Sequence, residues 1–469
     1  MRPTQAQSEA IARFLQGKSF KLLAYAGSGK TTTLRLMAEA APGRRILYLA
    51  FNRSVAEEAV TKFPKGVEVM TLHALAFRNA VSKNEALTAK FQARRGTVLV
   101  RDILESLEVP EVFGVPRYGV AVAVHATLGR FLTSDREAPS PEMVPPTALA
   151  LVSREADRAE FARFVAGLAA QAWAKMRDPG EGFPLSHDGY IRIWAEMGAP
   201  GLAQYEAVLV DEAQDLNPSL LRPLLDYAAR GGQLVAVGDR HQAIYAWRGA
   251  VNALDRLPGE ALSLPESFRF GQEVADYVEA LMEEAGRERL GLRGLGGPSE
   301  VVVGVGNPPR GAAFVYRTNA ALIRDAAALA AKGYRVEVVG GVDQAASLVE
   351  AGVRLMRGEK VWHPELAFFR NYEEFLKVAD LDPNLKALKK MLTYYGTRAL
   401  DMVRALQRSG RGRRVDYTFS TTHKAKGLEW DHVVLGDDFP PREEATEEEW
   451  NLRYVAATRA KRVLDIRHW

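Results

Sequence analysis

A glycine-rich loop after an apolar segment constrains the fold of this chain more than any other feature. The loop reads Ala24-Tyr25-Ala26-Gly27-Ser28-Gly29-Lys30-Thr31, and residues 20–23 before it predict a strand. Small residues let successive backbone N–H groups point at phosphates, and the start of the following helix adds partial positive charge. The loop departs from the strict phosphate-loop pattern only at Ala24, where that pattern has a glycine. It predicts a nucleotide-binding strand–loop–helix unit.

A pair of adjacent carboxylates supplies the second half of this chemistry. Val208-Leu209-Val210 predicts a buried strand, and Asp211 and Glu212 follow where it ends. One carboxylate can hold Mg²⁺, and its neighbour can polarise the water that attacks a γ-phosphate. An apolar strand that ends in Asp-Glu also occurs for purely structural reasons. Because the phosphate loop lies upstream, the two motifs together predict hydrolysis of a nucleoside triphosphate.

Composition excludes several other classes of protein. The chain has 469 residues, of which 47% are hydrophobic and 26% charged, as in globular proteins with several domains. The formal net charge of +4 neither demands nor excludes nucleic acid. The absence of cysteine excludes disulfides, cysteine-ligated zinc and iron–sulfur clusters. Because no signal pattern and no apolar run of about 18 residues is present, we expect a soluble, cytoplasmic protein without membrane contact.

Strands and helices alternate in two stretches of the chain, which predicts α/β domains with parallel sheets. Further strands are expected at residues 45–51, 67–72, 208–210, 234–238, 301–303, 313–316 and 336–340, with the last strand pair inside 418–435. Helical patterns cover residues 76–200 and residues 345–410. Loops at 139–146 and 179–184 interrupt the first of these stretches. The acidic run 443–449 and the basic run 411–414 are interpreted as solvated surface.

We therefore expect four parts. Residues 1–75 and 200–264 form the first sheet domain, 76–199 a helical insertion, 265–344 and 413–469 the second sheet domain, and 345–412 a smaller helical insertion.

A third motif follows the strand expected at residues 234–238. It places Gln242 shortly before Tyr245, Trp247 and Arg248. A glutamine amide can sense a γ-phosphate, and aromatic faces can stack on nucleobases. Packing of the two aromatics behind the sheet is the alternative, although their polar neighbours favour a loop that faces solvent.

These motifs resemble those of superfamily 1 DNA helicases of the UvrD/Rep type along the whole chain. Residues 50–59 (AFNRSVAEEA), 71–77 (TLHALAF) and 239–242 (DRHQ) carry a narrower similarity to the F-box DNA helicase branch and its small bacterial relatives. UvrD itself usually has Asp at the position of His241. The resemblance implies two RecA-like parallel-sheet motor domains with helical insertions, the second insertion reduced, and ATP with Mg²⁺ as ligands.

The resemblance also implies roles for single residues. Gln7 matches the residue that reads the adenine edge, with Gln5 a competing but less well-spaced candidate. Phe268 would stack on adenine and Glu429 would lie near the ribose, while Arg269 and Arg459 would stabilise charge on the γ-phosphoryl group. The expected nucleotide-binding residues are Gln7, Ala26, Gly27, Ser28, Gly29, Lys30, Thr31, Thr32, Phe268 and Glu429. The expected catalytic residues are Lys30, Asp211, Glu212, Gln242, Arg269 and Arg459, with Thr31 and Asp211 as the Mg²⁺ ligands.

A DNA track is implied in the same way. Its expected residues are Phe51, Asn52, His73, Tyr245, Trp247, Arg248 and His423, the last of which matches a residue that couples DNA to the nucleotide. The implied function is an ATP-dependent translocase and helicase on single-stranded DNA and single-strand/duplex junctions, with repair or recombination proteins as further partners. ATP hydrolysis in an interdomain cleft would drive stepping along DNA, and the 3′→5′ polarity rests on resemblance alone.

Two alternatives remain at this point. Because only residues 345–412 are left for the second insertion, the chain could strip proteins such as recombinase filaments from DNA without efficient unwinding. A module whose DNA binding is gated by ATP is the other alternative.

Overall fold

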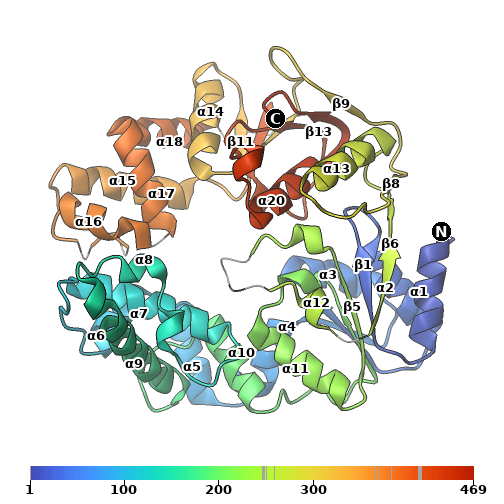
Figure 1. The fold of residues 1–469 in the computed structure, drawn as a ribbon, viewed down its shortest axis with the longest axis horizontal. Helices are drawn as coiled ribbons and strands as arrows, with labels where there is room; N and C mark the ends of the chain where they lie inside the picture. The colour runs from blue at the N-terminus through green and yellow to red at the C-terminus, as the bar shows by residue number, and fades with distance from the viewer. Residues whose placement is uncertain are drawn as a thin grey trace. The chain divides into compact units, whose positions relative to one another are not determined.

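The computed structural model of the chain describes residues 2–245, 249, 251–257, 259–363, 365–367, 369–381, 383–409 and 415–469. The chain forms two compact units. The first comprises Met1–Ala24 and Gly29–Leu264, and the second comprises Tyr25–Ser28 and Pro265–Trp469. Each unit contains a parallel sheet with helices against it, which Figure 1 shows in blue to green for the first unit and mainly in yellow to red for the second. The expected α/β fold class with two parallel sheets is confirmed.

The sheet of the first unit has the strand order β3-β2-β4-β5-β1-β6 within the described ranges, and all its pairings are parallel. The strands are β1 (Phe20–Ala24), β2 (Ile46–Ala50), β3 (Val67–Thr71), β4 (Ala207–Val210), β5 (Gln233–Gly238) and β6 (Glu260–Leu264). Every residue of β2, β4 and β5 is buried, as expected for central strands covered on both faces. In a parallel sheet the carboxyl ends of the strands lie at one edge, and the loops that follow them meet there.

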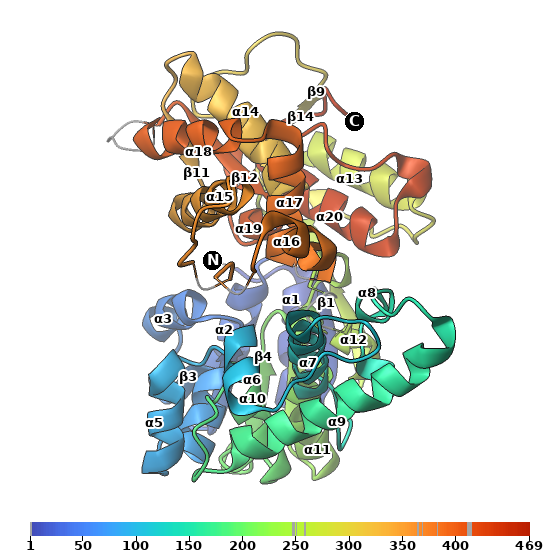
Figure 2. The same ribbon diagram turned by 90° about the vertical axis from the view of Figure 1, so that its left-hand side faces the viewer.

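Helices of the first unit cover this sheet and extend into a helical part. They are α1 (Gln5–Leu15), α2 (Lys30–Ala40), α3 (Arg53–Lys62), α4 (Leu72–Ala76), α5 (Glu85–Arg94), α6 (Val100–Ser106), α7 (Arg117–Leu132), α8 (Pro146–Leu149), α9 (Arg158–Arg177), α10 (His187–Glu196), α11 (Pro218–Ala229) and α12 (Ala253–Arg256). A π-helical turn, Phe77–Val81, continues α4. Figure 2 shows α7 and α9 side by side, and α7 is buried almost all round, as a central helix should be.

The expected loop at 139–146 is partly wrong. Pro141–Met143 forms a 3₁₀ turn, and Pro146 begins α8. Proline is common at the first position of a helix, because the N–H that it lacks would have no partner within the helix. The prolines that predicted a loop were therefore also compatible with the start of a helix.

The sheet of the second unit has the order β11-β12-β10-β13-β14-β9 in the described part of the chain, again with parallel pairings. Its strands are β9 (Glu300–Val302), β10 (Ala313–Tyr316), β11 (Val336–Val338), β12 (Tyr417–Thr421), β13 (Trp430–Leu435) and β14 (Ala460–Asp465), and β7 (Glu266–Ser267) pairs separately with β8 (Arg293–Gly294). The expectation that the last strand pair lies inside 418–435 is wrong, because β14 follows and pairs with both β13 and β9. The strand β14 includes the polar residues Lys461 and Arg462, of which Arg462 is exposed and Lys461 partly exposed. These two residues interrupt the apolar run by which a buried strand is recognised in a sequence.

Helices of the second unit are α13 (Gln272–Glu284), α14 (Asn319–Ala331), α15 (Asp343–Met356), α16 (Tyr372–Val378), α17 (Pro383–Tyr395), α18 (Arg398–Ser409), α19 (Thr422–Ala425) and α20 (Glu447–Ala457). The helices α15, α17 and α18 pack on one another, and α17 and α18 also pack on α14. The division of the chain into four parts stays a prediction. No helix in the described ranges is both long and apolar enough to span a membrane.

The acidic run is only partly solvated. Glu449 pairs with Arg317 at 2.7 Å, and its side chain is only 14% exposed. Glu447, Glu448 and Glu449 form the first turn of α20, where the helix dipole favours negative charge. The interpretation of 443–449 as solvated surface is therefore wrong at Glu449, and the basic run 411–414 lies outside the described residues.

Candidate nucleotide-binding site

The phosphate loop joins β1 to α2 in a conformation that requires glycine. Gly27 and Gly29 have φ angles of 76° and 75°, which lie in the left-handed region that glycine enters without a steric penalty. A Cβ on Gly27 would lie 2.6 Å from both Ser267 Oγ and Arg269 Cβ. Ser28 Oγ is buried and has no hydrogen-bond partner among the described residues. A phosphate oxygen would supply the acceptor that this hydroxyl lacks, so the loop fits a phosphate ligand.

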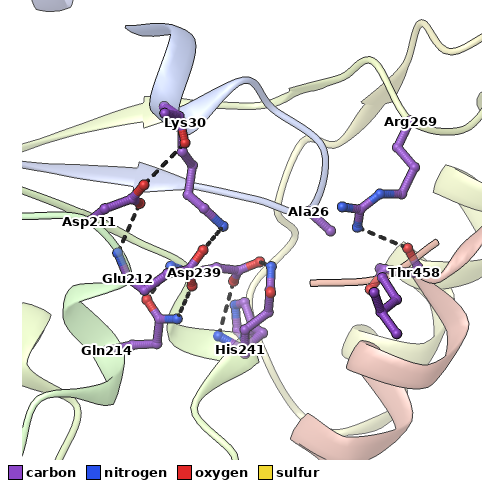
Figure 3. Close-up of polar contacts among 12 residues, drawn as sticks. Ala26, Lys30, Asp211, Glu212, Gln214, Asp239, His241, Arg269 and Thr458 are labelled. Atoms are coloured by element: carbon purple, nitrogen blue, oxygen red, sulfur yellow. Dashed lines mark hydrogen bonds and ion pairs between the residues drawn. The ribbon is translucent and has the colours of Figure 1, made fainter. Parts of the chain in front are cut away.

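Lys30, the first residue of α2, is a mostly buried cation, and its side chain is 13% exposed. Its ammonium forms an ion pair with Glu212 (Figure 3), in which Nζ lies 2.9 Å from Oε1. Burial disfavours the charge, but Glu212, Asp239 and Asp211 outweigh burial and raise the pKa of Lys30. The lysine therefore remains protonated and available to an anion.

Asp211 follows β4 and is almost fully buried. Its Oδ2 accepts hydrogen bonds from Tyr48 Oη at 2.7 Å and Thr31 Oγ1 at 3.1 Å. Burial raises the pKa of Asp211, and the charge of Glu212 adds to this, whereas Lys30 and the two hydroxyl donors oppose it. Burial, together with Asp211, also raises the pKa of Tyr48 far above its usual range, so the phenol remains a hydrogen-bond donor.

The two predicted Mg²⁺ ligands, Thr31 and Asp211, are brought into contact by this arrangement. No group of three or more His, Cys, Asp or Glu side chains in the described ranges could hold a metal by itself. Mg²⁺ is commonly bound through one or two carboxylates together with substrate phosphates, and it keeps several waters. A hydroxyl and a carboxylate beside a phosphate loop fit that pattern of ligands.

Glu212 has an unusual backbone conformation. Its φ angle of 51° lies in the left-handed region, which is strained for a residue with a side chain and occurs often at functional sites. Gln214 Nε2 donates to Glu212 Oε2 at 2.5 Å, and Gln214 Oε1 accepts the Asp239 N–H at 3.0 Å. Gln214 thus connects the ends of β4 and β5. Sequence reasoning missed Gln214, although its place inside Asp-Glu-Ala-Gln-Asp was a usable signal.

Gln242 belongs to the same cluster. Its Nε2 donates to Asp239 Oδ2 at 2.7 Å, and it is almost fully buried. Asp239 is one of the carboxylates that raise the pKa of Lys30. The structure therefore brings the predicted sensor Gln242 together with the lysine cluster through Asp239, which sequence reasoning had not singled out.

Gln7 is fixed beside α2. It forms a capping box with Thr4 at the start of α1, and its Nε2 donates to Thr33 Oγ1 at 3.1 Å. Gln7 is buried, whereas Gln5 is exposed and Thr32 is partly exposed. Of the two glutamine candidates, Gln7 is the one that contacts the helix following the phosphate loop.

The second unit holds another group of predicted residues. Arg269 Nε lies 2.7 Å from Glu429 Oε2, and Arg269 Nη1 donates to the Thr458 carbonyl at 3.1 Å (Figure 3 shows the latter contact). The N–H of Phe268 donates to the Gly27 carbonyl at 2.9 Å, and the residue is 44% exposed. The adenine-stacking candidate is therefore accessible, and Glu429 is engaged by Arg269.

Arg459 is buried to 1% exposure. Its guanidinium donates to the carbonyls of Val455 and Leu428 at 2.8 and 3.2 Å and to Thr458 Oγ1 at 3.0 Å. Its backbone carbonyl accepts the Trp430 N–H at 3.0 Å. Arg459 thus holds the residues on both sides of Glu429.

The predicted DNA contacts have varied environments. Phe51 is 39% exposed, and its ring stacks on that of Tyr245 with centroids 6.2 Å apart. Asn52 Oδ1 caps α3 by accepting the Val55 N–H, and the half-buried His423 lies on α19. Trp247 and Arg248 lie outside the described residues.

His73 packs edge-on against the rings of His187 and Tyr190, 6.1 and 6.2 Å away. Burial, with a smaller contribution from His187, lowers the pKa of His73 to about 4. Its side chain is therefore a neutral member of an aromatic cluster.

Comparisons with known proteins agree with these motifs. Residues 7–248, just over half of the chain, match the family model of an AAA domain, and residues 374–468 match that of the UvrD-like helicase C-terminal domain. The chain is 29% identical to F-box DNA helicase 1 of Gallus gallus over 502 aligned residues and 29% identical to F-box DNA helicase protein 1 of Schizosaccharomyces pombe over 495. Both alignments cover 96% of this chain, and they cover 47% and 55% of the relatives.

A lower similarity extends to ATP-dependent DNA helicase UvrD2 of Mycobacterium tuberculosis. It is 26% identical over 330 residues, which cover 55% of this chain and 46% of that protein. The chain therefore spans about half the length of the curated relatives it matches. The two family models match successive parts of the chain, and the F-box helicases align with nearly all of it, which confirms the resemblance inferred from the motifs. The chain belongs to the UvrD-like superfamily 1 helicase family, with similarity to the F-box DNA helicases over almost its whole length.

Proposed function

We propose that the chain is an ATP-dependent motor on single-stranded DNA that also unwinds duplex. The observation that carries this proposal is the partly buried cluster of Lys30, Thr31, Asp211 and Glu212, in which a protonated lysine, a hydroxyl and two carboxylates meet beside a phosphate loop. This set contains the groups that phosphate binding, Mg²⁺ binding and activation of water require. The DNA part of the proposal comes from membership of the helicase family and from the names of the relatives.

Lys30 and Glu212 change partners in this proposal. In the structure the two side chains form an ion pair, with Lys30 Nζ 2.9 Å from Glu212 Oε1. A phosphate would attract the Lys30 ammonium more strongly, which would free the Glu212 carboxylate to accept a proton from the attacking water. Mg²⁺ held by Thr31 and Asp211 would offset negative charge on the phosphates. Gln214 would keep Glu212 oriented through its amide.

Arg269 and Arg459 supply positive charge in this proposal. Charge that develops on a γ-phosphoryl group in the transition state is stabilised by guanidinium groups, typically by factors of about 10³–10⁵ in rate. Arg269 fits this role because two of its donors are fixed by Glu429 and Thr458 while its side chain remains 14% exposed. Arg459 is the more buried of the two, and its hydrogen bonds to the Leu428 carbonyl and the Trp430 N–H also give it a structural role.

Phe51 and Tyr245 are proposed to stack on bases of the DNA strand. Stacking of a base on an aromatic ring contributes about 1–3 kcal/mol, enough to hold a base yet weak enough to release it. The 3′→5′ polarity and the preference for single-strand/duplex junctions are proposed from family resemblance.

Paired assays test this proposal against its alternatives. Unwinding of 3′-tailed and 5′-tailed duplexes would be measured beside displacement of streptavidin from biotinylated single strands, with Lys30→Ala as the inactive control. We expect ATP-dependent unwinding of the 3′-tailed duplex only. Displacement without unwinding would favour a translocase that strips proteins, an alternative consistent with the small helical set α15–α18. ATP hydrolysis without either activity would favour the DNA-binding module.

A further inference from the structure

The first half of the phosphate loop is held by residues that lie far away in the sequence. The Ala26 N–H donates to the hydroxyl of Tyr454 at 3.2 Å, and the Gly27 carbonyl accepts the Phe268 N–H at 2.9 Å. Both contacts lie within the second unit, which includes Tyr25–Ser28. The shape of this part of the loop therefore depends on distant contacts as well as on its glycines.

Tyr454 is a fixed acceptor. It is fully buried in α20, and all residues of that helix from Trp450 to Ala457 are buried. A close-packed interior leaves such a ring little freedom to move. Ala26 is also fully buried, so its N–H has no access to water. Because an unpaired buried N–H is unfavourable, the hydroxyl of Tyr454 favours this loop conformation over others.

The same end of α20 also contacts the proposed arginine. Thr458 N–H donates to the Tyr454 carbonyl at 3.0 Å, and the Thr458 carbonyl accepts Arg269 Nη1 at 3.1 Å. A single helical turn thus holds both the loop backbone and the guanidinium. Arg269 and Gly27 are close enough that even a Cβ at Gly27 would clash.

We propose that Tyr454 is a positioning residue for nucleotide binding, an inference that rests on the proposed function. Its hydroxyl keeps the Ala26 N–H in both the nucleotide-free and the nucleotide-bound protein. The N–H groups that follow in the loop and in the first turn of α2 then remain available to phosphates. Tyr454 contacts no phosphate itself and acts through the backbone of Ala26.

The variant Tyr454→Phe tests this role because it removes one oxygen atom and keeps the ring. We expect the Kd for Mg-ADP, measured by isothermal titration calorimetry, to weaken about tenfold, which corresponds to about 1.4 kcal/mol. Tyr316→Phe is the matched control, since Tyr316 is also buried in the second unit and its hydroxyl donates to Asp325 on α14 at 2.7 Å. This control should lower the melting temperature at least as much and leave the Kd unchanged.

Three results would overturn the proposal. An unchanged Kd in a Tyr454→Phe protein of lowered melting temperature would mean that the hydroxyl is only structural. A tighter Kd would mean that the hydroxyl competes with phosphate for the Ala26 N–H. Failure of the wild-type protein to bind Mg-ADP would remove the proposed function itself and is recognised without any variant.

Hydrogen exchange on the wild-type protein gives a test that does not depend on folding of the variant. Mass spectrometry of peptides spanning the loop should show a slowly exchanging Ala26 amide without nucleotide and with Mg-ADP. Rapid exchange in the nucleotide-free protein would contradict a fixed bond to Tyr454.

Discussion

The ion pair between Glu429 and Arg269 leads to the most discriminating prediction about the nucleotide site. Family resemblance places Glu429 near the ribose, but in the structure its carboxylate lies 2.7 Å from Arg269 Nε. If this contact orients the guanidinium, Glu429→Ala should lower kcat and leave KM for ATP almost unchanged, because the arginine is proposed to act on the transition state. A ribose contact would instead raise KM.

The expected magnitude follows from the exposure of the two side chains. Arg269 is 14% exposed and Glu429 is 43% exposed, so solvent screens the pair in part. Exposed ion pairs contribute roughly 0.2–1 kcal/mol, and hydrogen bonds to charged groups roughly 1.5–3 kcal/mol. We expect about 1 kcal/mol for this half-exposed contact, which is a decrease of about fivefold in kcat.

A double-mutant cycle on steady-state ATPase activity measures the coupling. In an Arg269→Ala background, Glu429→Ala should have no further effect on kcat, since the group that it orients is gone. Asp431→Ala is the matched control, because this carboxylate pairs with Lys461 at 3.1 Å and should leave kcat unchanged in both backgrounds. Equal effects of Glu429→Ala with and without Arg269 would refute the reasoning, and so would a rise in KM without a fall in kcat.

Three other predictions concern the first unit. Lys30→Ala should abolish ATP turnover. Glu212→Gln should also stop turnover but keep binding of Mg-ATP, because Thr31 and Asp211 remain. Loss of nucleotide binding in Glu212→Gln, measured by calorimetry, would argue for a structural role of Glu212. Burial lowers the pKa of His73 from 6.5 to about 4, so as the pH falls the imidazole binds a proton in the unfolded chain before it does so in the folded protein. The free energy of unfolding should therefore decrease below pH 6.5, by about 2 kcal/mol at pH 5. Urea unfolding at pH 7 and pH 5 should show that His73→Phe removes this decrease, and an unchanged pH dependence would contradict it. Phe51→Ala should weaken single-stranded DNA binding by about 1–3 kcal/mol and lower DNA-stimulated ATPase while sparing the DNA-free rate; an equal effect of Leu15→Ala, which truncates an exposed side chain on α1, would contradict a specific stack.

Local sequence was sufficient for the features that depend on the backbone of a short segment. The phosphate loop needs small residues and left-handed φ angles at Gly27 and Gly29, and those requirements are visible in eight consecutive letters. The apolar run before Asp211 predicts a buried strand wherever the rest of the chain lies, because central parallel strands are covered on both faces. These two segments were enough to predict the chemistry of the proposed site, whereas the fold class also needed the alternation of strands and helices along the chain.

The partner of each side chain was decided by the tertiary structure. Tyr48 donates to Asp211, which lies 163 positions away, and Tyr454 accepts from Ala26, which lies 428 positions away. Any buried phenol is compatible with an ordinary core, so neither tyrosine has a signal of its own in the sequence. His73 belongs to a motif that predicts DNA contact, yet its ring packs against His187 and Tyr190. A motif specifies residue types over a few positions, whereas burial and hydrogen-bond partners arise only when distant segments pack together.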